Sequence, residues 1–361
     1  MKPKIFSYYL PQFHEIEENN LWWGKRFTEW TNLRKAKKLF KNHKILYPKN
    51  SYYYDLSDPK TIEWQIKIAK DHGISGFTYY HYWFKGRKIL EKPAEKFLSY
   101  GNLQHEYYFM WANHDWTRSW VGNNKQMLIK QTYGSKKDWE NHFNYLLPFF
   151  QDKRYLKING MPVFEIYIPK DIPNFDEMIE LWNSLAKLNN FPGIYLVEHH
   201  DYLDLVSRKP SIHTKAVTYQ QHSMGLVDYL KNRSLPKKVI EYLKKKFSLG
   251  PAIYDYEEVS KYVIKFNESI KTNSQFDVVL QSNTGWDNTP RYGKKGYVLH
   301  NGSEKLFKDN LLSAYKTACK NNWKILNIAC WNEWAEGMVL EPSEQFGNKY
   351  LEAVKDVIKP V

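Results

Sequence analysis

The sequence predicts an α/β fold, a (β/α)8 TIM barrel with elaborated loops. Short apolar runs alternate with longer stretches of helical spacing, as expected when helices connect the strands of a parallel sheet. Eight such apolar runs can be identified along the chain, the number that a closed barrel of this class requires. The length of 361 residues suits one barrel with insertions. We therefore expect residues 1–361 to form a single catalytic domain.

The predicted elements follow one another along the whole chain. The eight runs are apolar and rich in β-branched or aromatic residues, and they cover Lys4–Leu10, Gly76–Tyr80, Tyr107–Trp111, Pro162–Tyr167, Gly193–Glu198, Ala216–Gln220, Asp277–Gln281 and Ile325–Cys330. Apolar spacing and start signals such as Asp58-Pro59 predict helices over Pro59–His72, Asp138–Phe150, Phe175–Leu188 and Gln345–Ile358. Two longer stretches, residues 12–54 and 224–256, are predicted to be loop insertions.

The charge balance favours anionic partners. The chain has 53 basic and 39 acidic residues, a net charge of +14. Basic residues gather in Arg34–Lys44 and Lys237–Lys246, and the second segment has the spacing of an amphipathic helix. Such a helix can contact an anionic membrane peripherally, although a solvated lysine-rich face explains the pattern equally well. The sequence carries no nucleic-acid-binding signature, so nucleic acid is not an expected partner.

The sequence lacks several common signals. It contains no apolar stretch of the roughly 18 residues that a membrane span needs, and no secretion signal follows Met1. We therefore expect a cytoplasmic protein, at the inner face of the membrane if the basic segment binds lipid. Cys319 and Cys330 have no metal-binding spacing, and glycine-rich phosphate loops are absent. No metal and no cofactor are predicted.

The segment Trp331–Gly337 is the strongest candidate for a functional site. It places Glu333 and Glu336 three residues apart, interleaves them with two indoles, and follows the last predicted strand. Barrel enzymes carry their chemistry at such strand ends, and paired carboxylates are typical of enzymes that cleave or form glycosidic bonds. A solvated helix face is the structural alternative for a Glu-x-x-Glu pattern. The interleaved indoles, which suit the apolar faces of sugar rings, favour a catalytic pair.

Aromatic and polar residues also follow the other predicted strands. A barrel would gather these strand ends on one face, and an aromatic content of 17% favours a cleft lined with rings. The predicted substrate-binding residues are Tyr9, Gln12, His14, Trp30, Tyr80, His81, Trp83, Asn113, His114, Asp115, Trp116, Arg118, Glu165, Tyr167, His199, Trp286, Asp287, Asn332 and Trp334. Sugar hydrogen bonding is a sufficient use for the histidines in this set.

Ordered blocks along nearly the whole chain resemble the WbsX-type glycosyltransferase family. The blocks include Tyr9–His14, Trp22–Gly24, Phe27–Asn32, Gly285–Thr289 and Trp331–Gly337. That family is similar to the family 99 glycoside hydrolases, the endo-α-mannosidases, which are (β/α)8 barrels. The resemblance implies a carbohydrate-active enzyme of bacterial surface polysaccharide assembly, that is, of lipopolysaccharide O-antigen or capsule. The implied partners are a glycan or lipid-linked oligosaccharide substrate and an activated sugar donor.

The resemblance also implies roles for the two carboxylates. Asn332, Glu333, Trp334 and Glu336 match the family 99 pattern Asn-Glu-Trp-x-Glu. By similarity, Glu333 acts as base on the sugar 2-hydroxyl and produces a 1,2-anhydro intermediate with retention. Glu336 acts as general acid and then as base toward the acceptor. Neighbouring like charges and burial beside indoles separate the pKa values of such a pair.

The sequence departs from the family pattern in one loop, and two other functions stay open. After Trp111-Ala112-Asn113, this chain has His114-Asp115 where relatives have Glu-Asn. That departure bears on which donor the loop would recognise. An endo-acting glycoside hydrolase would use the same carboxylates and the same intermediate, with water as acceptor. A non-catalytic glycan-binding barrel would use the pocket without turnover.

Overall fold

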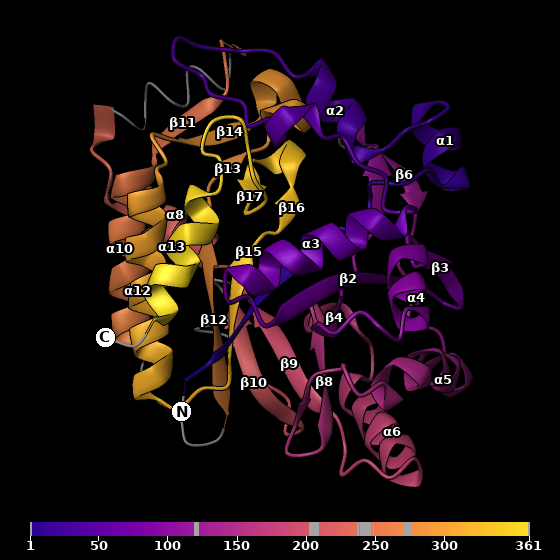
Figure 1. The fold of residues 1–361 in the computed structure, drawn as a ribbon. Coiled ribbons are helices and arrows are strands. Elements are labelled where there is room, and N and C mark those ends of the chain that lie inside the picture. Colours follow the sequence, from indigo (N-terminus) through magenta and orange to yellow (C-terminus); the bar gives the residue numbers. More distant parts are fainter. Residues whose placement is uncertain are drawn as a thin grey trace.

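Eight parallel strands close into a barrel in the computed structural model, which describes residues 2–118, 123–201, 209–236, 238, 247, 249–270 and 276–359 (Figure 1). The strand order around the barrel is β1-β15-β12-β10-β9-β8-β4-β2, and β2 pairs back onto β1 with Phe6 opposite Gly76. Helices cover the outside of the barrel. The predicted (β/α)8 class is confirmed.

All eight predicted strands are present, with their ends shifted by a few residues. The barrel strands are β1 (Lys4–Tyr9), β2 (Gly76–Phe84), β4 (Glu106–Trp111), β8 (Met161–Ile166), β9 (Tyr195–His200), β10 (Thr214–Tyr219), β12 (Asp277–Asn283) and β15 (Ile325–Ala329). Their residues are nearly all buried, because side chains on one face fill the barrel and those on the other pack against helices. β2 is longer than predicted, since it continues into a hairpin with β3 (Arg87–Ile89).

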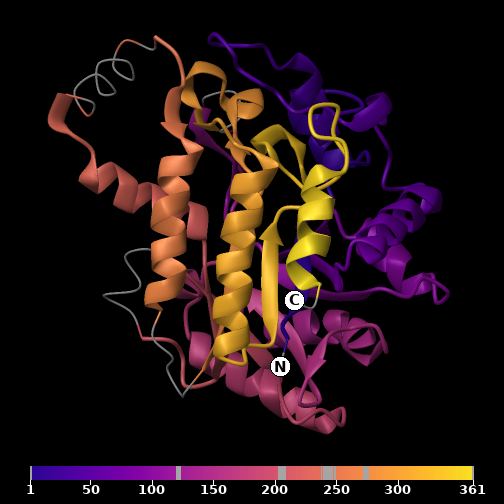
Figure 2. The same ribbon diagram turned by 60° about the vertical axis from the view of Figure 1, so that its left-hand side comes forward.

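The four predicted helices correspond to α3 (Pro59–Asp71), α5 (Lys136–Gln151), α6 (Phe175–Leu188) and α13 (Lys349–Ile358). α3 begins where the sequence indicates, because the Asp58 carboxylate accepts the Lys60 amide and Pro59 occupies the first turn. The other α-helices are α1 (Glu17–Trp23), α2 (Glu29–Lys35), α4 (Lys92–Ser99), α8 (Gln221–Asn232), α10 (Tyr256–Ser269), α11 (Thr289–Tyr292) and α12 (Glu304–Lys320). Figure 2 shows α10, α12 and α13 side by side against the barrel.

Short elements gather beyond the carboxyl ends of the barrel strands. A hairpin of β16 (Asn332–Glu333) and β17 (Met338–Val339) lies directly beyond β15, near the sheet of β11 (Ala252–Asp255), β14 (Tyr297–His300) and β13 (Trp286–Asp287) (Figure 1). Other short elements are β5 (Trp116–Arg118), β6 (Asn123–Ile129), η1 (Lys49–Ser51), η3 (Pro169–Asp171), η4 (Gly293–Lys295) and η5 (Trp334–Glu336). β7 (Lys157–Ile158) lies instead at the opposite end of the barrel, where it pairs with the start of β8.

The two predicted insertions differ in how much of them is described. Residues 12–54 form α1, α2 and η1, and the basic residues of Arg34–Lys44 are largely exposed. In the second insertion, the predicted amphipathic helix over Lys237–Lys246 lies outside the described residues except for Lys238. Its contact with membrane therefore stays a prediction. Among the helices that the structure describes, none combines the length and apolar character needed to cross a membrane.

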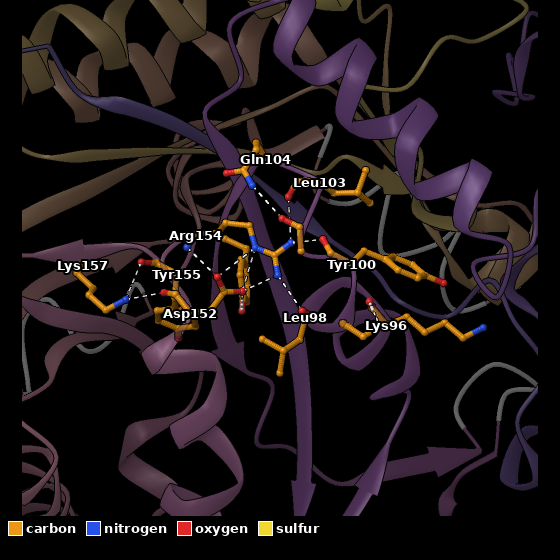
Figure 3. A network of polar contacts seen from close by, with 12 residues as sticks. Lys96, Leu98, Tyr100, Leu103, Gln104, Asp152, Arg154, Tyr155 and Lys157 are labelled. Carbon is orange, nitrogen blue, oxygen red and sulfur yellow. Dashed lines mark hydrogen bonds and ion pairs between the residues drawn. The ribbon is translucent and has the colours of Figure 1, made fainter.

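Arg154 ties together chain segments at the amino-terminal end of the barrel (Figure 3). Its side chain is 7% exposed and forms an ion pair with Asp152. Its guanidinium also donates to the carbonyls of Leu98, Tyr100 and Leu103, at 3.0, 2.8 and 2.9 Å. These carbonyls lie at and beyond the carboxyl end of α4, where helical carbonyls lack partners within the helix. One planar cation thus satisfies three backbone acceptors and a carboxylate.

Replacing Arg154 by lysine should lower the free energy of unfolding by about 2 kcal/mol, since an ammonium group cannot reach three carbonyls and a carboxylate in one plane. Urea denaturation of the wild type and Arg154→Lys measures this difference. Lys153→Arg, which changes the preceding residue, is the matched control and should be neutral. Equal stability of wild type and Arg154→Lys would show that the fork geometry of arginine is dispensable here.

Candidate active site

The segment Trp331–Gly337, which we call the catalytic segment because it carries the candidate carboxylates, is held in place by Asn332. The ladder between β1 and β15 ends with the Trp331 amide donating to the Tyr8 carbonyl at 2.7 Å, just after the cis Ala329–Cys330 peptide bond. The Asn332 side chain then accepts the Leu10 amide at 2.8 Å and donates to the Leu10 carbonyl at 3.1 Å. Its amide therefore acts as an extra rung between the two strand exits. The sequence predicts that Asn332 binds substrate. The structure shows instead that Asn332 does not line the cavity and holds the segment that carries the two carboxylates.

Gly337 allows the segment to turn back sharply. Its φ is +64°, a conformation that L side chains rarely adopt. A Cβ at this position would lie 2.9 Å from the Asp287 Cβ. Asp287 is itself fixed, since its carboxylate contacts His43 Nε2 at 2.7 Å and accepts the Thr289 amide at 2.9 Å. The closing glycine of the motif is needed for close packing, and Asp287 holds the rim instead of facing substrate.

A cavity of about 530 Å³ opens at the carboxyl ends of the barrel strands. Every barrel strand contributes a residue at or just beyond this end. Ten of the predicted site residues line it: Gln12, Tyr80, His114, Asp115, Trp116, Tyr167, His199, Trp286, Glu333 and Glu336. Residues distant in sequence are thus brought together, and the lining combines aromatic rings with hydrogen-bonding groups. Such a lining suits a sugar, which presents apolar ring faces and many hydroxyls.

The Glu333 carboxyl lies deep in this cavity and is 7% exposed. Burial raises its pKa far above the ordinary glutamate range, and the charge of Glu336 raises it further. The charge of Arg291 and a hydrogen bond from the Cys330 thiol, at 3.3 Å, act in the opposite direction. Glu333 is therefore a group that can hold or accept a proton near neutral pH, as an acid/base catalyst must.

Arg291 links Glu336 to a third carboxylate, Glu29, an arrangement that the sequence did not reveal. The Arg291 guanidinium contacts a Glu29 oxygen at 2.8 Å through Nε and pairs with Glu336 through Nη1. The side chains of Arg291 and Glu29 are 8% and 0% exposed, so the ion pairs are shielded from solvent. Both residues lie within or just after aromatic motifs, Phe27–Asn32 and Gly285–Thr289. An acidic residue in one such motif and a basic residue just after the other were the signal that could have identified Glu29 and Arg291 as partners.

The barrel interior below the cavity is a hydrogen-bonded polar network. Glu165, fully buried, accepts the hydroxyls of Tyr8 at 2.8 Å and Tyr108 at 3.3 Å, and contacts His199 Nε2 at 2.7 Å. The Gln281 amide donates to the Tyr8 hydroxyl at 3.0 Å. Tyr8, His199 and Gln281 also line the cavity floor. Glu165 therefore supports the floor from beneath, although it had been predicted to contact substrate.

Several other predicted site residues pack away from the cavity. Trp30 and Trp334 are 4% and 1% exposed, and their rings contact each other with centroids 5.8 Å apart. Tyr9 donates to Gln65, and His81 contacts His142 at 2.8 Å. Trp83 stacks on His142 with centroids 4.5 Å apart. These five side chains support the barrel wall, and the expectation that Trp334 stacks on sugar in this cavity is corrected.

The three remaining predicted residues also lie outside the cavity lining. His14 is 3% exposed, and burial lowers its pKa to about 4. Asn113 pins the loop after β8 by accepting the Ile168 amide at 2.8 Å. Arg118 donates to the Trp22 carbonyl at 2.7 Å on the rim. Among the described residues, no three His, Cys, Asp or Glu side chains are grouped as metal ligands would be.

Gln12 is the cavity residue with the clearest unmet hydrogen-bonding capacity. It is 3% exposed, and its Nε2 has no hydrogen-bond partner among the described residues. The backbone carbonyl of Gln12 accepts the backbone amide of Glu29 at 3.0 Å, which fixes the loop beside the carboxylates. A buried donor without a partner costs free energy unless a ligand supplies the acceptor. The Gln12 amide is thus placed to donate to a substrate oxygen.

Replacing Gln12 by alanine should weaken substrate binding about tenfold, which corresponds to one lost hydrogen bond to the ligand. The stability of the variant should not fall, because the amide donor has no partner in the protein to lose. KM or direct ligand titration, together with thermal denaturation, measures the two effects. A variant that binds normally would show that this donor meets water and not substrate.

Comparisons with known proteins concern the family and the fold of the chain. The family described as "Glycosyltransferase WbsX" matches residues 5–354 of the chain. Two proteins described as "Uncharacterized protein WxcX", from Xanthomonas campestris pv. campestris strains B100 and ATCC 33913, are each 27% identical over 98% of the chain. The match covers 49% of each relative, so the chain spans about half the length of the curated relatives it matches.

Solved structures show the same fold. A "Glycoside hydrolase-like protein" superposes with a TM-score of 0.64 at 14% identity, over 100% of this chain and 95% of that one. The GH99 endo-alpha-mannosidase from Bacteroides thetaiotaomicron gives a TM-score of 0.57 at 13% identity, over 98% and 96%. At these identities the likeness concerns the fold alone.

Proposed function

Because the chain belongs to the WbsX glycosyltransferase family, we propose that this carbohydrate-active enzyme transfers a sugar with retention during bacterial surface polysaccharide assembly, O-antigen or capsule. Glu333 and Glu336 are the proposed catalytic residues. The acceptor is a glycan or lipid-linked oligosaccharide, and the donor is an activated sugar. We propose that the reaction takes place in the cytoplasm, with the basic segment Lys237–Lys246 in peripheral contact with anionic lipid at the inner face of the membrane.

The proposed reaction proceeds in two steps. In the first, Glu333 removes the proton of the sugar 2-hydroxyl, O2 attacks C1, and the leaving group departs with the electrons of the bond to C1. In the second, Glu336 takes the proton of the acceptor hydroxyl, whose oxygen attacks C1 and opens the 1,2-anhydro ring. O2 recovers its proton from Glu333. Two inversions at C1 give net retention, and both carboxyl groups contact the reacting atoms.

The observation that carries the proposal is the carboxylate pair in an aromatic cavity, with Arg291 paired to Glu336. The guanidinium pairs with Glu336 as a carboxylate, the form required of a base toward the acceptor. A glycoside hydrolase would first need a protonated Glu336, because an alkoxide leaves poorly without a proton. A phosphate leaving group needs none. The ion pair therefore favours transfer from a phosphate-activated donor over the alternative of hydrolysis.

A non-catalytic binding barrel is the weaker alternative. A binding site gains nothing from a deeply buried carboxyl whose pKa is raised by a neighbouring carboxylate, since that arrangement costs free energy. The same arrangement is useful for proton transfer near neutral pH. The placement of Glu333 therefore supports catalysis.

Product analysis in water enriched in oxygen-18 tests the proposal. Wild type and the Glu333→Gln/Glu336→Gln double variant would be incubated with lipid-linked oligosaccharides and nucleotide- or lipid-phosphate-activated sugars, with mass spectrometry as readout. Transfer lengthens the acceptor and leaves no heavy oxygen in the product. Hydrolysis instead places heavy oxygen on the released sugar and would replace the transferase proposal. Turnover that persists in the double variant would overturn the site assignment.

A further inference from the structure

A second cavity, of about 540 Å³, lies beside η1 and the middle of α3. We call it the Trp64 cavity. Its lining residues come from three chain segments: Pro48, Lys49, Asn50, Tyr52 and Tyr54; Trp64 and Ile68; and Trp334, Glu341, Pro342 and Asn348. Trp334 does not line the reaction cavity but does line this one. The catalytic segment therefore has a cavity on each side.

The lining of the Trp64 cavity has the chemistry of a carbohydrate site. Tyr52 and Trp64 meet edge to face with centroids 5.1 Å apart, and Tyr52 is 41% exposed. Rings that stay partly open to solvent offer apolar faces for the C–H groups of a sugar ring. The side-chain amides of Asn50 and Asn348 can donate to hydroxyls and accept from them. Aromatic faces with amides around them fit a neutral sugar.

The rim of the cavity is held in a costly conformation. Asn50 and Ser51 have φ values of +56° and +52°, in the left-handed region that asparagine tolerates but that is costly for serine. The backbone amide of Asn50 donates to the Glu344 carboxylate at 2.5 Å, and the backbone amide of Lys49 donates to the Pro342 carbonyl at 3.0 Å. Backbone of this kind persists where surrounding contacts hold it, often at ligand sites. It presents Asn50 and Tyr52 at the mouth of the cavity.

The floor of the Trp64 cavity is hydrogen-bonded to the catalytic segment. Glu341, 3% exposed, accepts the Trp334 indole N–H and the Tyr54 hydroxyl, both at 2.8 Å. The Asn332 amide donates in turn to the Tyr54 hydroxyl at 3.3 Å. Burial raises the pKa of Glu341 to about 7, against the lowering effect of its donors. Trp334 stands between the two catalytic glutamates in the chain, so one network joins both cavities.

We propose that the Trp64 cavity is a second carbohydrate-binding site, which holds a neutral sugar unit of a glycan chain outside the reaction cavity. Stacking on Tyr52 and Trp64 supplies the apolar contact, and the amides of Asn50 and Asn348 select hydroxyl-bearing rings. The site goes beyond the proposed transfer reaction, because it requires binding and no turnover.

Ligand binding by the Glu333→Gln/Glu336→Gln double variant tests this proposal without interference from turnover. The probe is the oligosaccharide repeat released by mild acid from the surface polysaccharide of the source cell, titrated by calorimetry. We expect two sites in this background, and one site after Trp64→Ala or Tyr52→Ala is added. Trp64→Phe, which keeps a ring, should keep two sites. Tyr262→Ala on α10, a half-buried tyrosine that lines neither cavity, is the matched control.

The outcomes separate the two proposals. Binding stoichiometry that is unchanged by both Trp64→Ala and Tyr52→Ala, in variants that remain folded by circular dichroism, would overturn the second site. Loss of one site in these variants supports it even if the wild type shows no transfer. Conversely, if the wild type transfers sugar but the double variant has a single binding site, the proposed function stands and the proposal of a second site is wrong.

Discussion

Replacing the carboxyl of Glu333 or Glu336 by an amide should lower kcat by roughly a thousandfold, the effect expected when a positioned acid/base is lost. Gln at position 333 cannot accept the 2-hydroxyl proton, and Gln at position 336 cannot accept the proton of the acceptor. Both steps need their proton acceptor, so the double variant should be hardly slower than either single one. Initial rates by mass spectrometry, for Glu333→Gln, Glu336→Gln and the double variant, measure this.

Two controls make the result specific. Glu352→Gln, on the exposed face of α13, removes a carboxylate outside the site and should leave kcat unchanged. Azide attacks C1 without losing a proton, so it should restore turnover to Glu336→Gln and not to Glu333→Gln. The product would be a glycosyl azide with retained configuration. Full activity of Glu336→Gln without azide would remove this residue from the mechanism.

Replacing Arg291 by methionine should lower the free energy of unfolding by about 3–5 kcal/mol, the usual cost of removing one partner of a buried ion pair. The fully buried Glu29 carboxylate would lose the cation that it contacts at 2.8 Å. Adding Glu29→Gln to Arg291→Met should recover much of this loss, because the uncompensated charge is then gone. Chemical denaturation of the two single variants and the double variant gives the coupling free energy.

The stability lost in Arg291→Met should increase with pH, because Glu29 titrates differently in the folded and unfolded protein. Burial already raises the pKa of Glu29, and Arg291 lowers it, so methionine at position 291 raises it further. Between the unfolded and folded pKa values the folded protein binds more protons than the unfolded chain. Stability therefore falls as pH rises through this window. We expect Arg291→Met to be closer to wild type at pH 5 than at pH 8.

The same variant should move the pH profile of kcat/KM. Arg291 also lowers the pKa of Glu333, so its removal shifts the acidic limb of the profile, where Glu333 becomes ionised, to higher pH. Arg291→Lys keeps the charge and should shift the limb less than methionine does. A profile unchanged in Arg291→Met would show that Arg291 has no electrostatic effect on the carboxylate pair.

Much of the fold could be predicted because strand and helix periods are local properties of the sequence. The eight apolar runs, for example Asp277–Gln281 and Ile325–Cys330, all became barrel strands, and the helix over Phe175–Leu188 has the predicted bounds. The carboxylate pair could likewise be placed at the end of the last strand. The carboxyl end of β2 could not be predicted, because its continuation to Phe84 depends on pairing with β3.

Side-chain direction and long-range partners could not be read from the pattern. The barrel, its open face and the candidate pair Glu333 and Glu336 could be inferred from the residues alone, since they follow from strand order and from two carboxylates next to one strand. The closed fold was needed to show that Trp334 turns away from the reaction cavity, and that Glu29 and Arg291, 262 positions apart, join Glu336. Contacts between distant segments are set by packing and charge neutralisation in the closed barrel, and neither leaves a local period in the sequence.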